Sequence, residues 1–185
     1  MENVYMEFYK KELEKMFSNT DFERFLDAPR IMRYSQLADY DSIKDLLPLV
    51  KDYVIILYET KKNSGHWMCL IRNEKILTFF DSYGFFPDEE LSFITRLQNK
   101  LLGQNKPFIR RLMKTGVDAG MKAMYSHTKY QSDSPKVATC GRWVILAVFM
   151  IHTMGHDLKG MKRIFDKAVK DSGKPYDIVA VDFTT

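Results

Sequence analysis

Hydrophobic residues in the middle of this chain gather in short continuous runs separated by polar turns. Three such runs, rich in β-branched and aromatic residues, occupy 53–58, 66–71 and 76–80. Runs of this length predict strands that are buried on both faces. The short connections between them predict antiparallel neighbours. With a fourth strand predicted at 122–129, the pattern indicates a mixed, largely antiparallel central sheet.

Apolar residues spaced three or four apart predict helices around this sheet. Pro87 would begin one of them and Gly103 would end it, with Leu91, Ile94, Leu97 and Leu101 as its buried stripe. Asp157 is a predicted N-cap for another. The predicted helices cover 4–17, 22–26, 41–47, 87–103 and 158–168. Residues 104–122 are expected to be irregular, and 176–183 to form a final strand or an extended tail. The fold class is therefore α+β, with helices flanking the sheet.

The apolar run from Trp143 to Ile151 is predicted to form a buried core helix. It is too short to span a bilayer, which takes roughly 20 residues. Cys140 would lie in the first turn of this helix, where unpaired N–H groups and the helix dipole favour a thiolate. Gly141 leaves room for a group to approach the sulfur. A reactive nucleophile is one interpretation of Cys140, and an inert buried cysteine is the other.

Composition limits the class of protein. The chain has 185 residues, of which 45% are hydrophobic, so 1–185 is expected to form a single domain on which the helical segment 1–50 packs. Two cysteines do not make a disulfide framework, which favours a reducing, intracellular compartment. The first residues do not resemble a secretory signal. A net charge of +4 permits binding to nucleic acid without requiring it.

A cysteine nucleophile needs a base, and the base needs an orienting group. His66 opens one predicted strand and Asp81 follows the next. If 72–75 is the turn between these strands, its centre lies between residues 73 and 74, and positions 66 and 81 are equally far from it. Cross-strand neighbours have Cβ atoms roughly 4.5–5.5 Å apart. The spacing therefore predicts that Asp81 holds the His66 imidazole.

The other candidate groups fit a site less well. His127 has no evident carboxylate partner, and Gly155 would interrupt any helix carrying both His152 and His156. We therefore expect no metal site and no cofactor. Cys69 lies inside a strand and is expected in the core. The basic cluster Arg110, Arg111 and Lys114 is expected to be a solvated face, with a nucleic-acid role as the alternative.

The oxyanion of an acyl-transfer reaction needs hydrogen-bond donors. The backbone N–H of Cys140 is one candidate. The side-chain amide of Gln131, on the loop that approaches the helix, is the second. Asn63, on a turn, is a weaker alternative.

Four short motifs occur in a recognisable order: Gly65-His66-Trp67, Phe80-Asp81-Ser82-Tyr83-Gly84, Gln131 and Thr139-Cys140-Gly141. This order resembles the adenain-like cysteine proteases of adenoviruses, large DNA viruses and virophages, and the SUMO-specific proteases of the same clan. The likeness covers residues 53–155. It implies a papain-like/adenain-like fold and a cysteine endopeptidase. It implies that His66 is the general base, Asp81 its orienter, Gln131 an oxyanion donor and Cys140 the nucleophile.

One feature departs from the resemblance. The interval of nine residues between Gln131 and Cys140 is longer than in the family. Either the loop at 132–136 carries an insertion, or another group is the donor.

The resemblance also implies substrates and a setting. Family members cut viral capsid precursors at Gly-containing sites during particle maturation, within the virion or in the host cytoplasm or nucleus. Some relatives need a DNA or peptide activator. Trp67 and Trp143 are expected to form the walls of a narrow, glycine-selective cleft. The alternatives are a deconjugase for a SUMO- or ubiquitin-like modifier, an acyltransferase, and a binding module that lacks activity.

Overall fold

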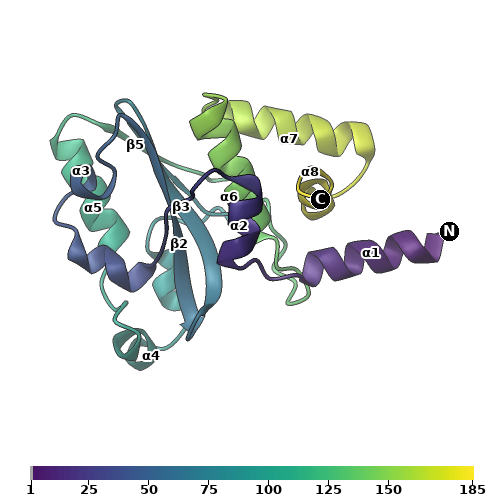
Figure 1. The fold of residues 1–185 in the computed structure, drawn as a ribbon, viewed down its shortest axis with the longest axis horizontal. Helices are drawn as coiled ribbons and strands as arrows, with labels where there is room; N and C mark the ends of the chain where they lie inside the picture. Colours follow the sequence, from purple (N-terminus) through teal and green to yellow (C-terminus); the bar gives the residue numbers. More distant parts are fainter. Residues whose placement is uncertain (1) are drawn as a thin grey trace.

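The computed structural model describes the backbone of residues 2–185 and the side chains of residues 4–185, and it has one mixed sheet at its centre (Figure 1). The strand order is β1-β2-β3-β4-β5. The central strands β2, β3 and β4 form an antiparallel meander, while β1 and β5 pair in parallel with β2 and β4 at the two edges. The strands are β1 (Ile31–Arg33), β2 (Lys51–Lys61), β3 (Ser64–Asn73), β4 (Ile76–Phe80) and β5 (Lys122–Tyr125).

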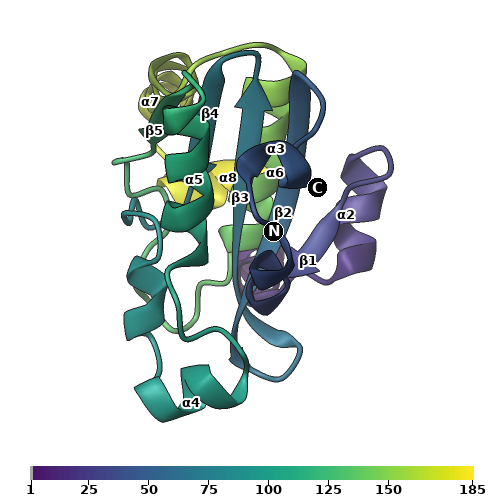
Figure 2. The same cartoon turned by 90° about the vertical axis from the view of Figure 1, so that its left-hand side faces the viewer.

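Helices cover both faces of this sheet, as Figures 1 and 2 show. One face packs against η1, α3 and α5, and the other against α2, α6, α7 and α8. The described helices are α1 (Glu2–Glu14), α2 (Asn19–Phe25), η1 (Tyr34–Asp39), α3 (Ile43–Leu46), η2 (Glu89–Ser92), α4 (Arg96–Leu101), α5 (Phe108–Asp118), α6 (Cys140–Ala147), η3 (Val148–Thr153), α7 (Leu158–Ser172) and α8 (Tyr176–Phe183). The α+β class and the mixed sheet flanked by helices are thus confirmed.

The strand predictions hold because the central strands are buried on both faces. In β2 the six residues 54–59 are all buried, and six consecutive residues of β3 are buried as well. Alternate side chains enter two separate cores, since successive residues of a strand point to opposite faces. Trp67, Cys69 and Ile71 join the core beneath α6, whereas Met68 and Leu70 join the core beneath α5.

Three predictions of secondary structure are wrong. Residues 176–183 form the helix α8, which follows Pro175, so their β-branched run belongs to a helix. Residues 108–118, predicted to be irregular, form the amphipathic helix α5. The single helix predicted at 87–103 is two elements, η2 and α4, because the side chain of Thr95 caps a new helix by accepting from the N–H of Gln98. Leu97 and Leu101 are consequently exposed.

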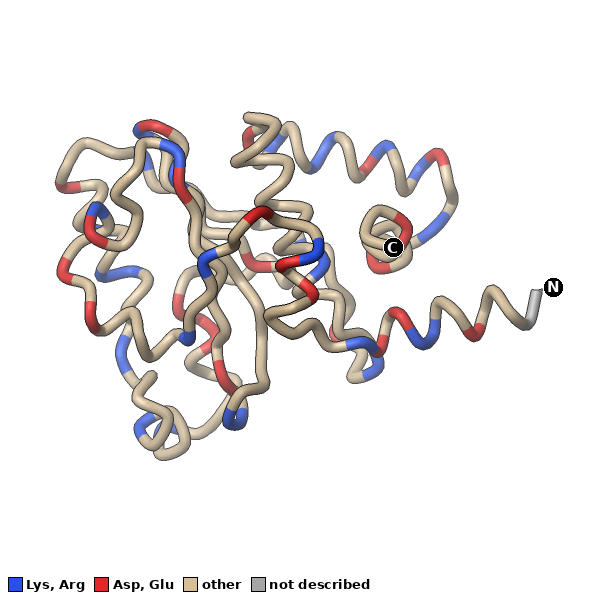
Figure 3. Tube along the Cα trace, viewed as in Figure 1, with Lys and Arg blue, Asp and Glu red and all other residues tan. Residues whose placement is uncertain are grey.

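Charges of both signs alternate along the chain trace (Figure 3). The predicted basic cluster lies on α5, where Arg110 pairs with Asp88 and Lys114 with Asp118. The Arg111 guanidinium donates to the carbonyl of Leu37 at 3.0 Å. None of the described helices is long and apolar enough to cross a membrane.

Candidate active site

Cys140 is the first residue of α6, and it lies against the central sheet. The preceding residue, Thr139, does not cap the helix, because its hydroxyl donates to the Asp177 carboxylate instead. Among the described residues no acceptor takes the N–H of Cys140. The first turn therefore leaves the Cys140 N–H open to another acceptor, and it places the positive end of the helix dipole next to the Cys140 sulfur.

Gly141 has a different role from the one expected. A Cβ at this position would lie 2.6 Å from the Cβ of Phe17. The absence of a side chain therefore lets the protein's own Phe17 pack against the first turn of α6. Phe17 is held there by a second contact, since its carbonyl accepts the indole N–H of Trp67 at 2.9 Å.

His66 and Asp81 meet, although the predicted register is wrong. The turn between β3 and β4 is Glu74-Lys75, with Asn73 opposite Ile76, so the centre of the hairpin lies one residue later than expected. In this register the position opposite His66 is residue 83, so Asp81, which directly follows β4, lies two residues before that position. A shift of two keeps both side chains on the same face, and a diagonal pair remains within reach of long side chains. The His66 Nε2 atom is in hydrogen-bond contact with Asp81 Oδ2.

The imidazole of His66 is held by Asp81 and by two aromatic rings, and the residue is only 5% exposed. The ring of Tyr83 stacks on it with centroids 4.9 Å apart, and the ring of Phe93 meets it edge-on. Asp81 is itself fully buried, and its Oδ1 accepts the backbone N–H of Tyr83 at 2.6 Å. Because Nε2 faces Asp81, Nδ1 is the nitrogen left for the Cys140 thiol.

The charge of Asp81 governs the protonation of His66. Burial of the imidazole lowers its pKa, but the charge of Asp81 and the hydrogen bonds to Asp81 and Cys140 raise it, and the net pKa lies well above the usual 6.5. An imidazolium is therefore favoured at neutral pH. This is the state that pairs with a thiolate.

A second carboxyl group, that of Glu90, lies close to this pair. It is fully buried, and neither of its oxygens has a hydrogen-bond partner within the described chain. Burial, followed by the charge of Asp81, raises the pKa of Glu90 to about 8. Glu90 is therefore mostly neutral at pH 7, which leaves Asp81 as the charged carboxylate that faces His66.

The side chain of Gln131 is buried at the same site, and its orientation is fixed. Its Oε1 accepts from the Ser82 hydroxyl at 2.8 Å, so its Nε2 must point the other way. That nitrogen donates to the Tyr83 hydroxyl at 3.2 Å and to the carbonyl of Val137 at 3.1 Å. Both amide hydrogens are thus engaged. An oxyanion could take one of them only if the Val137 carbonyl or the Tyr83 hydroxyl gave way.

These side chains surround one open cleft of about 240 Å³. His66, Cys140 and Gln131 line it, so the structure brings three of the four predicted catalytic side chains to a common hollow, with Asp81 behind His66. Trp67 and Phe17 form part of its wall. The cleft has the components that acyl transfer requires: a thiol, a base with its orienter, and N–H donors.

Of the two tryptophans predicted to form the walls of the cleft, only Trp67 lines it. Trp67 lines the cleft and packs edge-on against Phe22. The expectation that Trp143 lines it is wrong, because Trp143 is fully buried among Tyr130, Phe165 and Tyr176. It points from α6 into the core beneath the sheet.

The remaining candidates lie outside the cleft. Cys69 is buried in the core, as predicted, and burial raises the pKa of its thiol. His127 is exposed beside Tyr125, and His152 packs on Tyr53. Asn63 lies on the turn between β2 and β3 and does not line the cleft with Cys140. Among the described residues, no group of three or more His, Cys, Asp or Glu is placed to hold a metal ion.

Sequence reasoning missed three side chains that complete this site. Tyr83 stacks on His66, Ser82 orients Gln131, and Phe17 forms a wall. Ser82 and Tyr83 belong to the motif that follows Asp81, so their position was a usable signal. Phe17 is far away in sequence and gave none.

One relative of this chain comes from a virophage. This relative, "Uncharacterized protein V9" of Sputnik virophage, is 33% identical over 152 residues, which is 80% of this chain and 85% of the relative. The chain belongs to the V9 family. The sequence motifs predict a likeness to virophage proteins, and this relative agrees with that prediction. The name of the relative states no activity. No protein-family model matches the chain.

Among solved structures, the C-terminal Ulp1 protease domain, in complex with the yeast SUMO ortholog Smt3, is similar to this member of the V9 family at 14% sequence identity with a TM-score of 0.39. The matched region covers 80% of this chain and 72% of that one. A likeness at this level carries no information about activity.

Proposed function

We propose that this chain is a cysteine endopeptidase with Cys140 as nucleophile, His66 as general base and acid, and Asp81 as the orienting carboxylate. The observation that carries the proposal is the position of the buried His66 imidazole. It contacts Asp81 through Nε2, and it shares a cleft with a thiol at the start of a helix. A buried carboxylate that contacts an imidazole, with a thiol in the same cleft, favours nucleophilic catalysis over a structural role.

In the proposed reaction, the proton of the Cys140 thiol already resides on His66 Nδ1, in the thiolate–imidazolium pair that the raised pKa of His66 favours at neutral pH. The thiolate attacks the peptide carbonyl, forming an S–C bond and an oxyanion held by the Cys140 N–H and Gln131 Nε2. Collapse of this intermediate breaks the C–N bond, and the His66 imidazolium gives its proton to the leaving amine. Water then attacks the thioester, losing a proton to His66, and the acid product leaves with the thiol restored.

The long interval of nine residues between Gln131 and Cys140 is compatible with Gln131 as an oxyanion donor. The intervening residues form a loop, and one of its carbonyls, that of Val137, accepts from the Gln131 amide. In the reaction the oxyanion would replace this carbonyl as the acceptor. Gln131 is therefore proposed as the second donor. The proposal includes a shift of the loop at 134–138 on substrate binding, which moves the Val137 carbonyl away from the Gln131 amide.

The finer features of the proposal concern substrate and setting. Phe17 and Trp67 narrow the cleft next to the nucleophile, which supports a preference for glycine before the scissile bond. Membership in a virophage protein family supports viral precursor proteins, such as capsid precursors, as substrates. We further propose that residues 1–185 form one protease domain, and that no metal or organic cofactor takes part.

The test is cleavage of a peptide library by the wild-type protein, by Cys140→Ala and by Cys69→Ala, read by mass spectrometry. Cys69 is a matched control because it is the other buried thiol and lies outside the cleft. We expect cuts after glycine with the wild type and with Cys69→Ala, and none with Cys140→Ala.

Two results would change the proposal. Cuts that persist in Cys140→Ala would remove Cys140 from the mechanism. Cleavage of folded ubiquitin-like precursors, with no peptide cut, would replace the endopeptidase with a deconjugase.

A further inference from the structure

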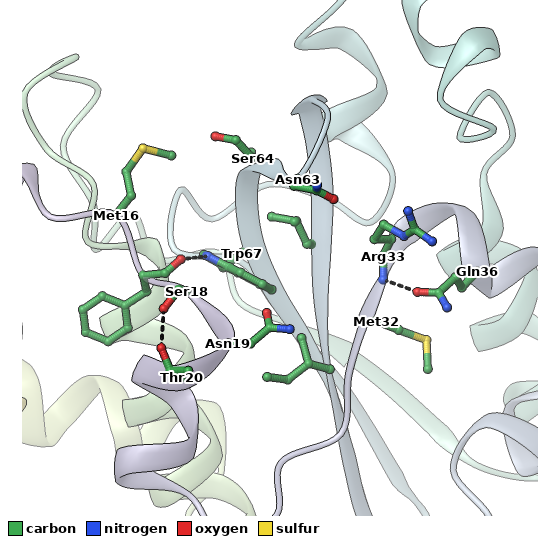
Figure 4. A pocket seen from close by; sticks show the side chains of 14 residues that line it. Met16, Ser18, Asn19, Thr20, Met32, Arg33, Gln36, Asn63, Ser64 and Trp67 are labelled. Carbon is green, nitrogen blue, oxygen red and sulfur yellow. Dashed lines mark hydrogen bonds between the residues drawn. The ribbon is translucent and has the colours of Figure 1, made fainter.

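A second hollow, of about 640 Å³, adjoins the proposed catalytic cleft. The two share the wall made by Met16, Phe17, Gly65 and Trp67, so they lie on either side of it. Figure 4 shows Ser18, Asn19 and Thr20 on one side of the second hollow and Arg33 and Gln36 on the other, with Asn63 and Ser64 at one end. The mechanism proposed above leaves this hollow without a role.

The floor of this hollow is built across three strands. Arg33 of β1 pairs with Leu57 of β2, and Leu57 pairs with Trp67 of β3. These three residues therefore form one row on the same face of the sheet. Neighbouring strands lie about 4.8 Å apart, which places the backbone of Arg33 about 10 Å from that of Trp67. An extended peptide covers this distance in about three residues.

The charge of the hollow is one-sided. Arg33 is the only ionisable residue that lines it, and among residues 4–185 no carboxylate forms an ion pair with Arg33. Two nearby acids are already engaged. Asp21 pairs with Lys15, and the carboxylate of Glu59 accepts the backbone N–H of Asn63.

Gln36 adds a second donor beside Arg33. Its Oε1 accepts the backbone N–H of Arg33 at 2.8 Å, which turns the amide so that its NH₂ group is left for another partner. A guanidinium and a free amide NH₂ on the same side of the hollow form a donor set that suits a carboxylate. Neutral hydroxyl and amide groups on the rim suit the main chain of a bound peptide.

We propose that this hollow is a substrate subsite that selects an acidic side chain, Asp or Glu, about three residues upstream of the glycine held against Trp67. The proposal rests on the proposed function for the direction of the chain, because it places the acyl side of the substrate against Trp67. The occupant is an extended polypeptide segment whose carboxylate binds Arg33 and Gln36.

The test separates binding from cleavage. Fluorescent peptides with a central Gly-Gly and one Glu scanned through the upstream positions are titrated into Cys140→Ala protein, together with the matching Glu→Gln and Glu→Lys peptides. A paired carboxylate should improve binding about 2- to 5-fold over Gln at one upstream position, because Arg33 is exposed. The Arg33→Ala change should abolish this difference, and Arg33→Glu should reverse it in favour of Lys. Arg163→Ala, an exposed arginine of α7, is the control and should leave the difference intact.

Each outcome decides one claim. Equal binding of Glu and Gln peptides at every position, or no binding of any peptide, overturns the acidic subsite. Cleavage of the same peptides by protein with Cys140 intact tests the proposed function separately. Acid-dependent binding without cleavage would uphold the subsite and count against the peptidase. Cleavage with no preference for an acidic residue would support the peptidase and overturn the acidic subsite.

Discussion

Replacing Asp81 by Asn should move the pKa of His66 from above its usual value to below it. The two side chains are in contact, and both are almost fully buried. Burial alone lowers the pKa of an imidazole, and in the intact protein the charge of Asp81, together with the hydrogen bonds to Asp81 and Cys140, overcomes this effect. The substitution removes the charge and leaves the burial. An opposite charge at this range shifts a pKa by about 1–3 units.

This shift corresponds to about 1.4–4 kcal/mol of lost preference for the imidazolium, at 1.36 kcal/mol per unit. If the thiolate–imidazolium pair is the attacking form, kcat/KM at pH 7 should fall about 10- to 1,000-fold. The pKa is measured directly by NMR titration of ¹⁵N-labelled histidine side chains, with the other three histidines as internal references.

The matched control is Asp118→Asn, an exposed carboxylate on α5 that pairs with Lys114. It should leave the titration of His66 unchanged. The reasoning would be refuted if His66 titrated below 6.5 in the wild-type protein, or at the same pH in the wild type and in Asp81→Asn.

Three further perturbations follow from the same site. Gln131→Ala should lower kcat about 100-fold or more with little change in KM, as for loss of an oxyanion donor, and an unchanged kcat in steady-state assays would exclude that role. Trp67→Ala should relax the glycine preference in a peptide library, whereas Trp67→Phe should largely keep it; identical profiles for the wild type and Trp67→Ala would argue against a wall at this position. Glu90 has a pKa of about 8 in the fold against 4.5 ordinarily, so the stability it contributes is complete below pH 4.5 and is lost as the pH rises through 8. Glu90→Gln should therefore flatten the fall in melting temperature between pH 5 and 8, and parallel curves for the two proteins would contradict this.

The three central strands were predictable because they are buried on both faces, whereas the short edge strand β1 was not predicted. A strand between two cores needs a continuous apolar run, and such a run is visible in a sequence without knowledge of the packing. The register was harder to predict. The β3–β4 turn is Glu74-Lys75, with Glu74 at a φ of 56°, and these residues do not carry the Asn-Gly or Asp-Gly signal of a two-residue turn.

The missed helices have different causes. Helix α5 buries Phe108, Ile109, Leu112, Met113 and Gly116, a helical spacing obscured by its basic residues. Helix α8 contains the run Ile178-Val-Ala-Val181, whose composition favours a strand. Pro175 and Asp177 were the local signs of a helix start, and packing on α1, α6 and α7 decides the outcome.

At the site, sequence reasoning was reliable where local structure determines position. Cys140 follows from the apolar helix that it begins, and the contact between His66 and Asp81 survives an error of two residues because the side-chain period of a strand is two. The position of Trp143 and the wall made by Phe17 depend on how distant segments pack. Neither was available from spacing along the chain.

The proposed chemistry depends on Cys140 being a nucleophile that His66 activates. The most direct test is reaction with a peptide that ends in Gly-Gly and carries an α,β-unsaturated methyl ester in place of the scissile bond, to which a thiolate adds to form a stable thioether, followed by peptide mapping by mass spectrometry. The account predicts one adduct, on Cys140 and not on Cys69, which is lost in His66→Ala protein that remains folded by circular dichroism. No adduct on Cys140 in the wild-type protein, or an equal rate of labelling without His66, would contradict it.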